Sequence, residues 1–213
     1  KEELSRLRSE NMTQQSALAE NIELRRTAGM RERQGWRTTV ANVIGRSPDS
    51  STRVLTIDRG RRDGLAPGMP VVAHVAGSPD ALIGLVDSLT DYTASVLLIT
   101  DARSNVSGQI LHRESNNEVS QPNGEVIGQW QLGSRLVMRK LDREAKIAPG
   151  DPVLSAGISR ALLLDAPAAR IPPNIPIGIV SAVRPSGHAQ EVDVQPYFDP
   201  DEVRTVWIIV GVD

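Results

Sequence analysis

The sequence has no cysteine among its 213 residues. Disulfide bonds, thiolate nucleophiles and cysteine-ligated metals are therefore excluded, whichever side of a membrane the protein occupies. Aromatic residues make up only 3% of the chain, against 39% for all hydrophobic residues. A core of this composition has to be built from aliphatic side chains, mainly valine, isoleucine, leucine and alanine.

A strong charge of one sign and a long apolar run are also missing. The formal net charge is −2, whereas a dedicated nucleic-acid-binding domain normally has a marked basic excess. No run approaches the ~18 apolar residues of a membrane-spanning helix, and no signal peptide is visible. The chain starts at Lys1 within a helical pattern and without an initiator methionine, so we expect the natural N-terminus to lie upstream.

Residues 1–30 differ from the rest because they contain no proline and follow a helical pattern. Their apolar seam is thin, and a helix of this kind is marginal unless it pairs with a partner. An asparagine in the seam weakens the pair but fixes its register and favours two strands. We predict a coiled-coil dimerisation helix here; the alternative is a solvated helix packed on its own domain. The predicted seam residues are Leu4, Leu7, Asn11, Leu18 and Ile22.

From Trp36 onward the pattern changes to short strands separated by turns. Runs rich in valine, isoleucine and threonine alternate with turn signals such as Asp63-Gly64, which is typical of an all-β barrel or sandwich. We predict a first β-domain over residues 36–112 and a second over 113–213, divided by the polar stretch that starts at 113. The pattern leaves open whether the last strand, 204–212, pairs within the second domain or with the first.

An internal repeat relates the two halves. Residues 65–72 (LAPGMPVV) match 147–154 (IAPGDPVL), and residues 82–86 (LIGLV) match 176–180 (PIGIV) in the same order. Proline fixes φ in the turn and the next glycine supplies a positive φ, while a glycine inside a strand marks a bend or a close backbone approach. The repeat therefore predicts two β-domains of similar design rather than a ligand site.

Several short motifs follow one another in a fixed order along the chain. They are ANVIGRSP at 41–48, IDRG at 57–60, GMPV at 68–71, LIGLV at 82–86, LLITD at 97–101, GDPV at 150–153, Ile177-Gly178 and Pro196. In this order, behind a helix, they resemble the MreC family of rod shape-determining proteins. Ser155-Ala156-Gly157 departs from the Thr-Ser-Gly of that family.

The resemblance implies a mainly β fold, in which an N-terminal coiled-coil helix precedes two small six-stranded β-barrel domains. It implies a single-pass protein of the bacterial cytoplasmic membrane, with a transmembrane helix upstream and this region on the extracytoplasmic or periplasmic side. The implied function is a non-enzymatic scaffold of the cell-elongation complex. The implied partners are a second copy of the chain, a class B penicillin-binding transpeptidase, MreD, RodA and MreB, with no cofactor and no nucleic acid.

A chymotrypsin-like protease is one alternative, because such enzymes also contain two small β-barrels. The histidines available to a Ser-His-Asp triad are His74, His112 and His188. Gly150-Asp151 resembles the start of a protease Gly-Asp-Ser-Gly motif, but Pro152 occupies the position of the nucleophile. The histidines also lack the spacing of metal ligands. We therefore expect no catalytic or metal site.

A periplasmic adaptor of a secretion or efflux system is another alternative, since adaptors also join helices to β-domains. Adaptors have helices on both sides of the β-domain, whereas only residues 1–30 are predicted to be helical here. Arg59, Arg61 and Arg62 form a basic cluster that fits either an exposed turn or a contact with an acidic partner.

An interaction surface is predicted in the second half of the chain. Residues 161–169 (ALLLDAPAA) are unusually hydrophobic for a connection, which fits either partial burial or an exposed docking patch. We predict that Leu162, Leu163 and Leu164 contribute to self-association or to a partner interface.

Overall fold

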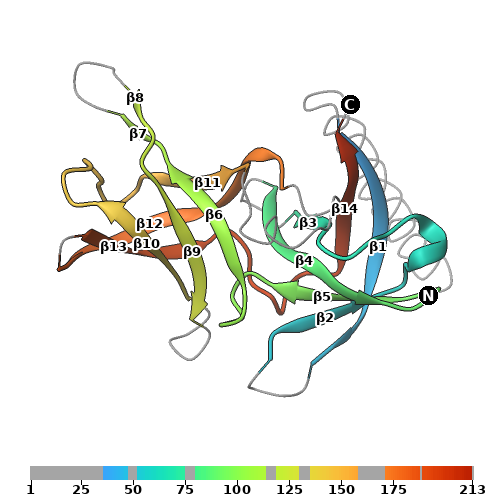
Figure 1. Cartoon of the computed structure of the whole chain (residues 1–213). Helices are drawn as coiled ribbons and strands as arrows, with labels where there is room; N and C mark the ends of the chain where they lie inside the picture. The colour runs from blue at the N-terminus through green and yellow to red at the C-terminus, as the bar shows by residue number, and fades with distance from the viewer. Residues whose placement is uncertain are drawn as a thin grey trace, which may run out of the picture. The chain divides into compact units, whose positions relative to one another are not determined.

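The computed structural model describes residues 36–47, 52–74, 80–113, 119–129, 135–157, 171–187 and 189–212. Strands dominate these ranges (Figure 1), and the one helical element among them is the 3-10 turn η1 (Arg61–Asp63). Within the described ranges, no helix has the length and apolarity that crossing a bilayer requires. The predicted coiled coil of residues 1–30, with Leu4, Leu7, Asn11, Leu18 and Ile22, lies outside the described residues.

The first barrel is closed by six strands in the order β1-β14-β3-β4-β5-β2. Its interior is aliphatic, as the composition predicts, with side chains such as Leu55, Val71 and Val96 at most 2% exposed. The strands are β1 (Trp36–Arg46), β2 (Val54–Ile57), β3 (Pro70–Ala73), β4 (Ala81–Leu89), β5 (Ala94–Leu98) and β14 (Thr205–Val212).

The second barrel is also closed by six strands, in the order β10-β13-β12-β11-β6-β9. Ile110, Leu136 and Ile177 are fully buried in it. Its strands are β6 (Asn105–Ile110), β9 (Asn123–Gln129), β10 (Arg135–Asp142), β11 (Pro152–Ala156), β12 (Pro173–Ser186) and β13 (Ala189–Pro196). Beyond the ends of β6 and β9, β7 (His112–Arg113) and β8 (Val119–Ser120) pair as a two-stranded ribbon (Figure 1).

The two barrels have the same cyclic strand order. Reading round the first barrel gives β14-β3-β4-β5-β2-β1, and reading round the second gives β6-β11-β12-β13-β10-β9. The sixth strand comes from different places in the chain, because β14 is the last strand of the sequence whereas β6 is the first of the second barrel. The barrels are therefore circular permutations of one design, and the second lies within the sequence of the first.

The sequence repeat forms the same turn in both barrels. Gly68 and Gly150 both have a positive φ, of 83° and 97°. The N–H of Gly68 donates to the carbonyl of Val86 at 2.7 Å, and the N–H of Gly150 donates to that of Val180 at 2.8 Å. The two halves of the repeat therefore make matching hydrogen bonds, as expected for two related domains.

The glycine inside the next strand is required by a close approach of main chains. A Cβ atom on Gly84 would lie 2.4 Å from the carbonyl oxygen of Leu97, and one on Gly178 would lie 2.2 Å from that of Gln195. A contact below 3.0 Å forces the backbone to shift. Both glycines therefore allow neighbouring strands to curve tightly into a small barrel.

The boundary expected at residue 113 differs from the structure. Residues 105–110 form β6 and belong to the second barrel, while the last strand, β14, returns to the first. The polar stretch from 113 onward includes the β7–β8 ribbon and the start of β9 rather than a linker between domains. An exposed hairpin and a linker share a polar composition, which is why the pattern alone did not distinguish them.

Candidate functional site

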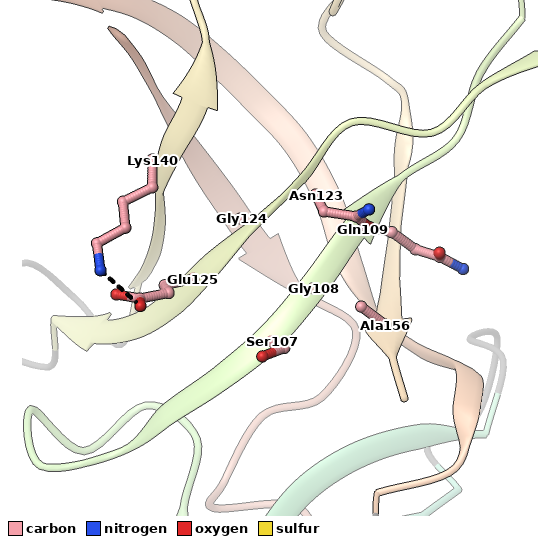
Figure 2. A pocket seen from close by; sticks show the side chains of 8 residues that line it. All are labelled: Ser107, Gly108, Gln109, Asn123, Gly124, Glu125, Lys140 and Ala156. Carbon is pink, nitrogen blue, oxygen red and sulfur yellow. Dashed lines mark hydrogen bonds and ion pairs between the residues drawn. The ribbon is translucent and has the colours of Figure 1, made fainter. Parts of the chain in front are cut away.

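A surface hollow of about 360 Å³ lies on the outside of the second barrel (Figure 2). It is lined by residues 107–109 of β6, 123–125 of β9, Lys140 of β10 and Ala156 of β11. We call this hollow the amide groove, because two carboxamide side chains, Gln109 and Asn123, stand on its wall (Figure 2).

Two glycines form the floor of the amide groove. Gly108 and Gly124 are directly paired between β6 and β9. A Cβ atom on Gly108 would lie 2.6 Å from Cγ2 of Val126, and one on Gly124 would lie 2.4 Å from the carbonyl oxygen of Arg139. Both Cβ positions point into the crowded inside of the barrel, so the groove floor between the outward-facing side chains is the main chain of β6 and β9.

The polar side chains at the rim come from the positions flanking these glycines. Ser107 is paired with Glu125, and Gln109 is paired with Asn123. Lys140 Nζ donates to Glu125 Oε1 at 2.7 Å (Figure 2). Lys140 and Glu125, the charged side chains among the described residues that line the groove, are therefore paired with each other.

Two residues at the groove have an unusual backbone conformation. Lys140 has a φ of 61° and Asn174 a φ of 67°, and they are the only described non-glycine residues with a positive φ. Lys140 lies where the β10–β13 pairing shifts register between Met138 and Leu141, as at a β-bulge. Asn174 Oδ1 accepts a hydrogen bond from Gln109 Nε2 at 2.7 Å. In these conformations the side chain of Lys140 reaches Glu125 and that of Asn174 reaches Gln109. Local backbone strain of this kind is concentrated at functional sites.

No sequence motif indicates this groove directly. Asn123 and Gly124 end the polar stretch that was expected to be a domain boundary, and Gln109 lies in the strand β6, which was not predicted. The pattern that could have indicated β6 is the alternation of Val106, Gly108 and Ile110, which recur at every second residue as in a half-buried strand.

His74 and His112 are each paired with one aspartate, and neither pair forms the complete Ser-His-Asp triad of the protease alternative. His74 Nδ1 lies 3.0 Å from Asp80 Oδ1, and His112 Nδ1 lies 2.8 Å from Asp151 Oδ2. Ser120 is paired with His112 across the β7–β8 ribbon, and its buried hydroxyl has no hydrogen-bond partner. No described serine hydrogen-bonds to either imidazole, so the proton transfer that a Ser-His-Asp triad needs has no formed path. His188 lies outside the described residues.

Ser155, the serine nearest to the Gly-Asp motif, has a structural role. Its hydroxyl donates to the carbonyl oxygen of Pro172 at 2.6 Å and accepts the N–H of Ile175 at 2.9 Å. These bonds join β11 to the start of β12, on either side of residues 158–170. Leu162, Leu163 and Leu164 belong to that segment and lie outside the described residues.

The basic cluster is largely neutralised. Arg59 lies 3.5 Å from Asp58 and 3.7 Å from Asp63, and Arg61 lies 3.2 Å from Asp91. Arg62 stacks over the exposed ring of Tyr92, 5.0 Å from its centroid. These pairs favour the exposed-turn interpretation over a surface for an acidic partner. Among the residues that the structure describes, no group of three or more histidine and carboxylate side chains could hold a metal ion.

Comparison with known proteins identifies the family. Residues 43–210 match the family described as "Rod shape-determining protein MreC, barrel core". This chain belongs to the MreC family. The resemblance seen in the sequence motifs is therefore confirmed, and it extends over both barrels.

Relatives and solved MreC structures agree with this assignment. The cell shape-determining protein MreC of Streptococcus pneumoniae is 28% identical over 195 residues, which is 89% of this chain and 65% of that protein. The chain thus spans slightly less than two thirds of that relative. A structure of the major periplasmic domain from the cell shape-determining filament MreC is 27% identical, with a TM-score of 0.66 and coverage of 83% of this chain and 96% of that one.

A more distant structure is a complex between the penicillin-binding protein PBP2 and MreC from Helicobacter pylori. It matches with a TM-score of 0.57 and 15% identity, covering 82% of this chain and 99% of that one. At this identity the match shows a shared fold. The two six-stranded barrels described above are accordingly the MreC fold.

Proposed function

We propose that this chain is the periplasmic part of a non-enzymatic scaffold in the bacterial cell-elongation complex. In this function it self-associates and docks onto a class B penicillin-binding transpeptidase, which it biases toward an active state. The observation that carries the proposal is the family match over 43–210, which covers nearly all of both barrels. The partners MreD, RodA and MreB, and attachment to the cytoplasmic membrane, belong to the same proposal.

Two solved relatives support the partner choice. MreC of Helicobacter pylori has been solved in a complex with PBP2, and another MreC domain is described as part of a cell shape-determining filament. Their common fold with this chain makes a synthase and a second copy the first partners to test.

Co-purification tests the synthase contact. The full chain should retain the class B transpeptidase of its own organism, and we expect aspartate at Leu162, Leu163 and Leu164 to weaken that retention or self-association. Ile44→Asp is a matched control, because Ile44 is an apolar residue that is 57% exposed on β1. Unchanged assembly and unchanged synthase binding in the triple variant, with circular dichroism showing a folded protein, would reject this docking patch.

The mass in solution tests the proposed dimerisation helix. We expect the chain to be dimeric and the variant that lacks residues 1–30 to be monomeric, because the seam of Leu4, Leu7, Asn11, Leu18 and Ile22 needs a partner helix. A dimer of unchanged affinity in the shortened chain would place self-association in the barrels instead.

A peptidase assay separates the scaffold from the protease alternative. Alanine at His74, His112 or His188 should leave synthase binding intact. A peptide-cleaving activity of the chain that disappears in His112→Ala or Ser120→Ala would overturn the non-enzymatic function, because these residues with Asp151 are the described group nearest to a triad.

A further inference from the structure

We propose that the amide groove of the second barrel binds a short, uncharged peptide with small side chains in an extended conformation. Gln109 and Asn123 would hydrogen-bond to the main chain of this peptide. The proposal goes beyond the scaffold function and stands independently of it, since it rests on the geometry of four strands of one barrel.

The charge of the groove selects an uncharged ligand. Among the described residues that line it, the ionic side chains are Lys140 and Glu125, whose Nζ and Oε1 atoms lie 2.7 Å apart. A phosphate or a metal ion would have to compete with this pair for its charge. A neutral ligand leaves this pair intact at one end of the groove.

The hydrogen-bonding groups match a peptide main chain. A carboxamide presents one carbonyl acceptor and an NH2 donor, which is the complement of a peptide group. Gln109 Nε2 is held by Asn174 at 2.7 Å, and its Oε1 has no described partner and can accept a peptide N–H. The carboxamide of Asn123, on the paired position of β9, and the hydroxyl of Ser107 likewise have no described partner.

The size and lining of the groove restrict the side chains of the ligand. The volume of about 360 Å³ is within the ~300–1,000 Å³ of small-ligand sites. The floor is the main chain of Gly108 and Gly124, and one wall is the methyl group of Ala156. No aromatic ring is among the described residues that line the groove, so these residues offer a sugar no flat apolar surface on which to stack. Peptides of alanine, glycine or serine fit this lining better.

The rim of the groove is organised before any ligand arrives. The left-handed conformations of Lys140 and Asn174 direct one side chain to Glu125 and the other to Gln109. Fixing the rim in the free protein lowers the entropic cost of binding. The two conformations therefore bring Lys140 and Asn174 into contact with residues that line the groove.

An NMR titration of the full, ¹⁵N-labelled chain tests the proposal, with N-acetyl-trialanine-amide as the probe. We expect saturable shifts of the main-chain amides of Gly108 and Gly124 and small shifts elsewhere. The double variant Gln109→Ala, Asn123→Ala should bind at least about ten-fold more weakly, because two hydrogen bonds are removed. Gln195→Ala, an exposed carboxamide on β13 of the same barrel, should bind as the unmodified chain does.

A second variant guards against misfolding in the first. Ser107→Gln fills the groove from its rim and keeps both carboxamides, and it should also abolish the shifts. Shifts that persist in both folded variants, or no saturable shift in the unmodified chain, would overturn the proposal. Tighter binding of di-N-acetylchitobiose than of the peptide would overturn the ligand class.

Discussion

The carboxylate of Asp58 accepts two hydrogen bonds from Asn42, one from its main-chain N–H at 2.7 Å and one from its side-chain Nδ2 at 3.0 Å. The N–H of Asp58 in turn donates to the carbonyl oxygen of Asn42 at 3.1 Å. The two residues belong to the first two family motifs, and their bonds fasten β1 to the end of β2 beside a register shift at Val43. These two motif residues therefore help to hold the first barrel closed.

Replacing Asp58 with alanine should lower the free energy of unfolding by about 1–2 kcal/mol, because two of the three hydrogen bonds between Asn42 and Asp58 are lost. Asp87→Ala is the control, since Asp87 is exposed on β4 and should change stability by less than about 0.5 kcal/mol. Urea denaturation followed by circular dichroism measures both. Equal stability of the two variants would contradict a structural role for this pair.

The sequence predicted the strands that carry strong hydrophobic patterns. β2 and β4 are examples, because valine, leucine and isoleucine fill most of their positions. The repeat predicted the matching turns at Gly68 and Gly150, because only a few residue types satisfy a proline-glycine turn. In each of these elements, the local residue pattern was sufficient to predict the structure.

The sequence did not predict β6 or the amide groove, for a different physical reason. β6 reads NVSGQI, and its serine, glycine and amide residues have little intrinsic preference for strands. Its strand conformation is fixed by non-local pairing with β9 and β11. The contacts from Lys140 to Glu125 and from Asn174 to Gln109 likewise join residues far apart in sequence, which no local pattern reports.

Alanine at Gly178 should be much more damaging than alanine at Gly150. The new Cβ at Gly178 would lie 2.2 Å from the carbonyl oxygen of Gln195, so the β12–β13 pairing has to shift. At Gly150 nothing lies within 4 Å, and the cost is limited to the positive φ of 97°, about 1–2 kcal/mol. Thermal unfolding compares the two variants. A larger loss in Gly150→Ala would show that the turn, rather than the close strand approach, limits stability.

Ser155→Ala should lower the free energy of unfolding by about 1–3 kcal/mol, because it leaves the buried carbonyl of Pro172 and the N–H of Ile175 without their partner. Ser181→Ala on β12 is the control, since its hydroxyl makes one exposed bond to the carbonyl of Asp193. Hydrogen exchange of the Ile175 amide should accelerate in the first variant only. Unchanged exchange would refute the role of Ser155 in holding β11 to β12.

Asp101 should make the stability of the protein depend on pH in the acid range. Its side chain is 1% exposed and accepts the N–H of Arg53 at 2.7 Å and the N–H of Arg103 at 2.9 Å. Burial alone would raise its pKa, but the bonds from Arg103 and Arg53 outweigh burial and hold the pKa below the usual 3.8. Since the folded pKa is the lower one, the stabilisation is complete above about pH 4 and is lost as the pH falls through the folded value.

Asp101→Asn tests this pH dependence, because it keeps the size of the side chain and removes the charge. We expect it to lower the free energy of unfolding by about 1–3 kcal/mol at pH 7, and by clearly less at pH 3, where the unmodified chain has begun to lose the same contribution. Glu202→Gln is the control, as an exposed carboxylate in the loop before β14. Urea denaturation at the two pH values gives the comparison. A loss of equal size at pH 7 and pH 3 would show that the variant acts through packing and that the ionised carboxylate is not what joins Arg53 to Arg103.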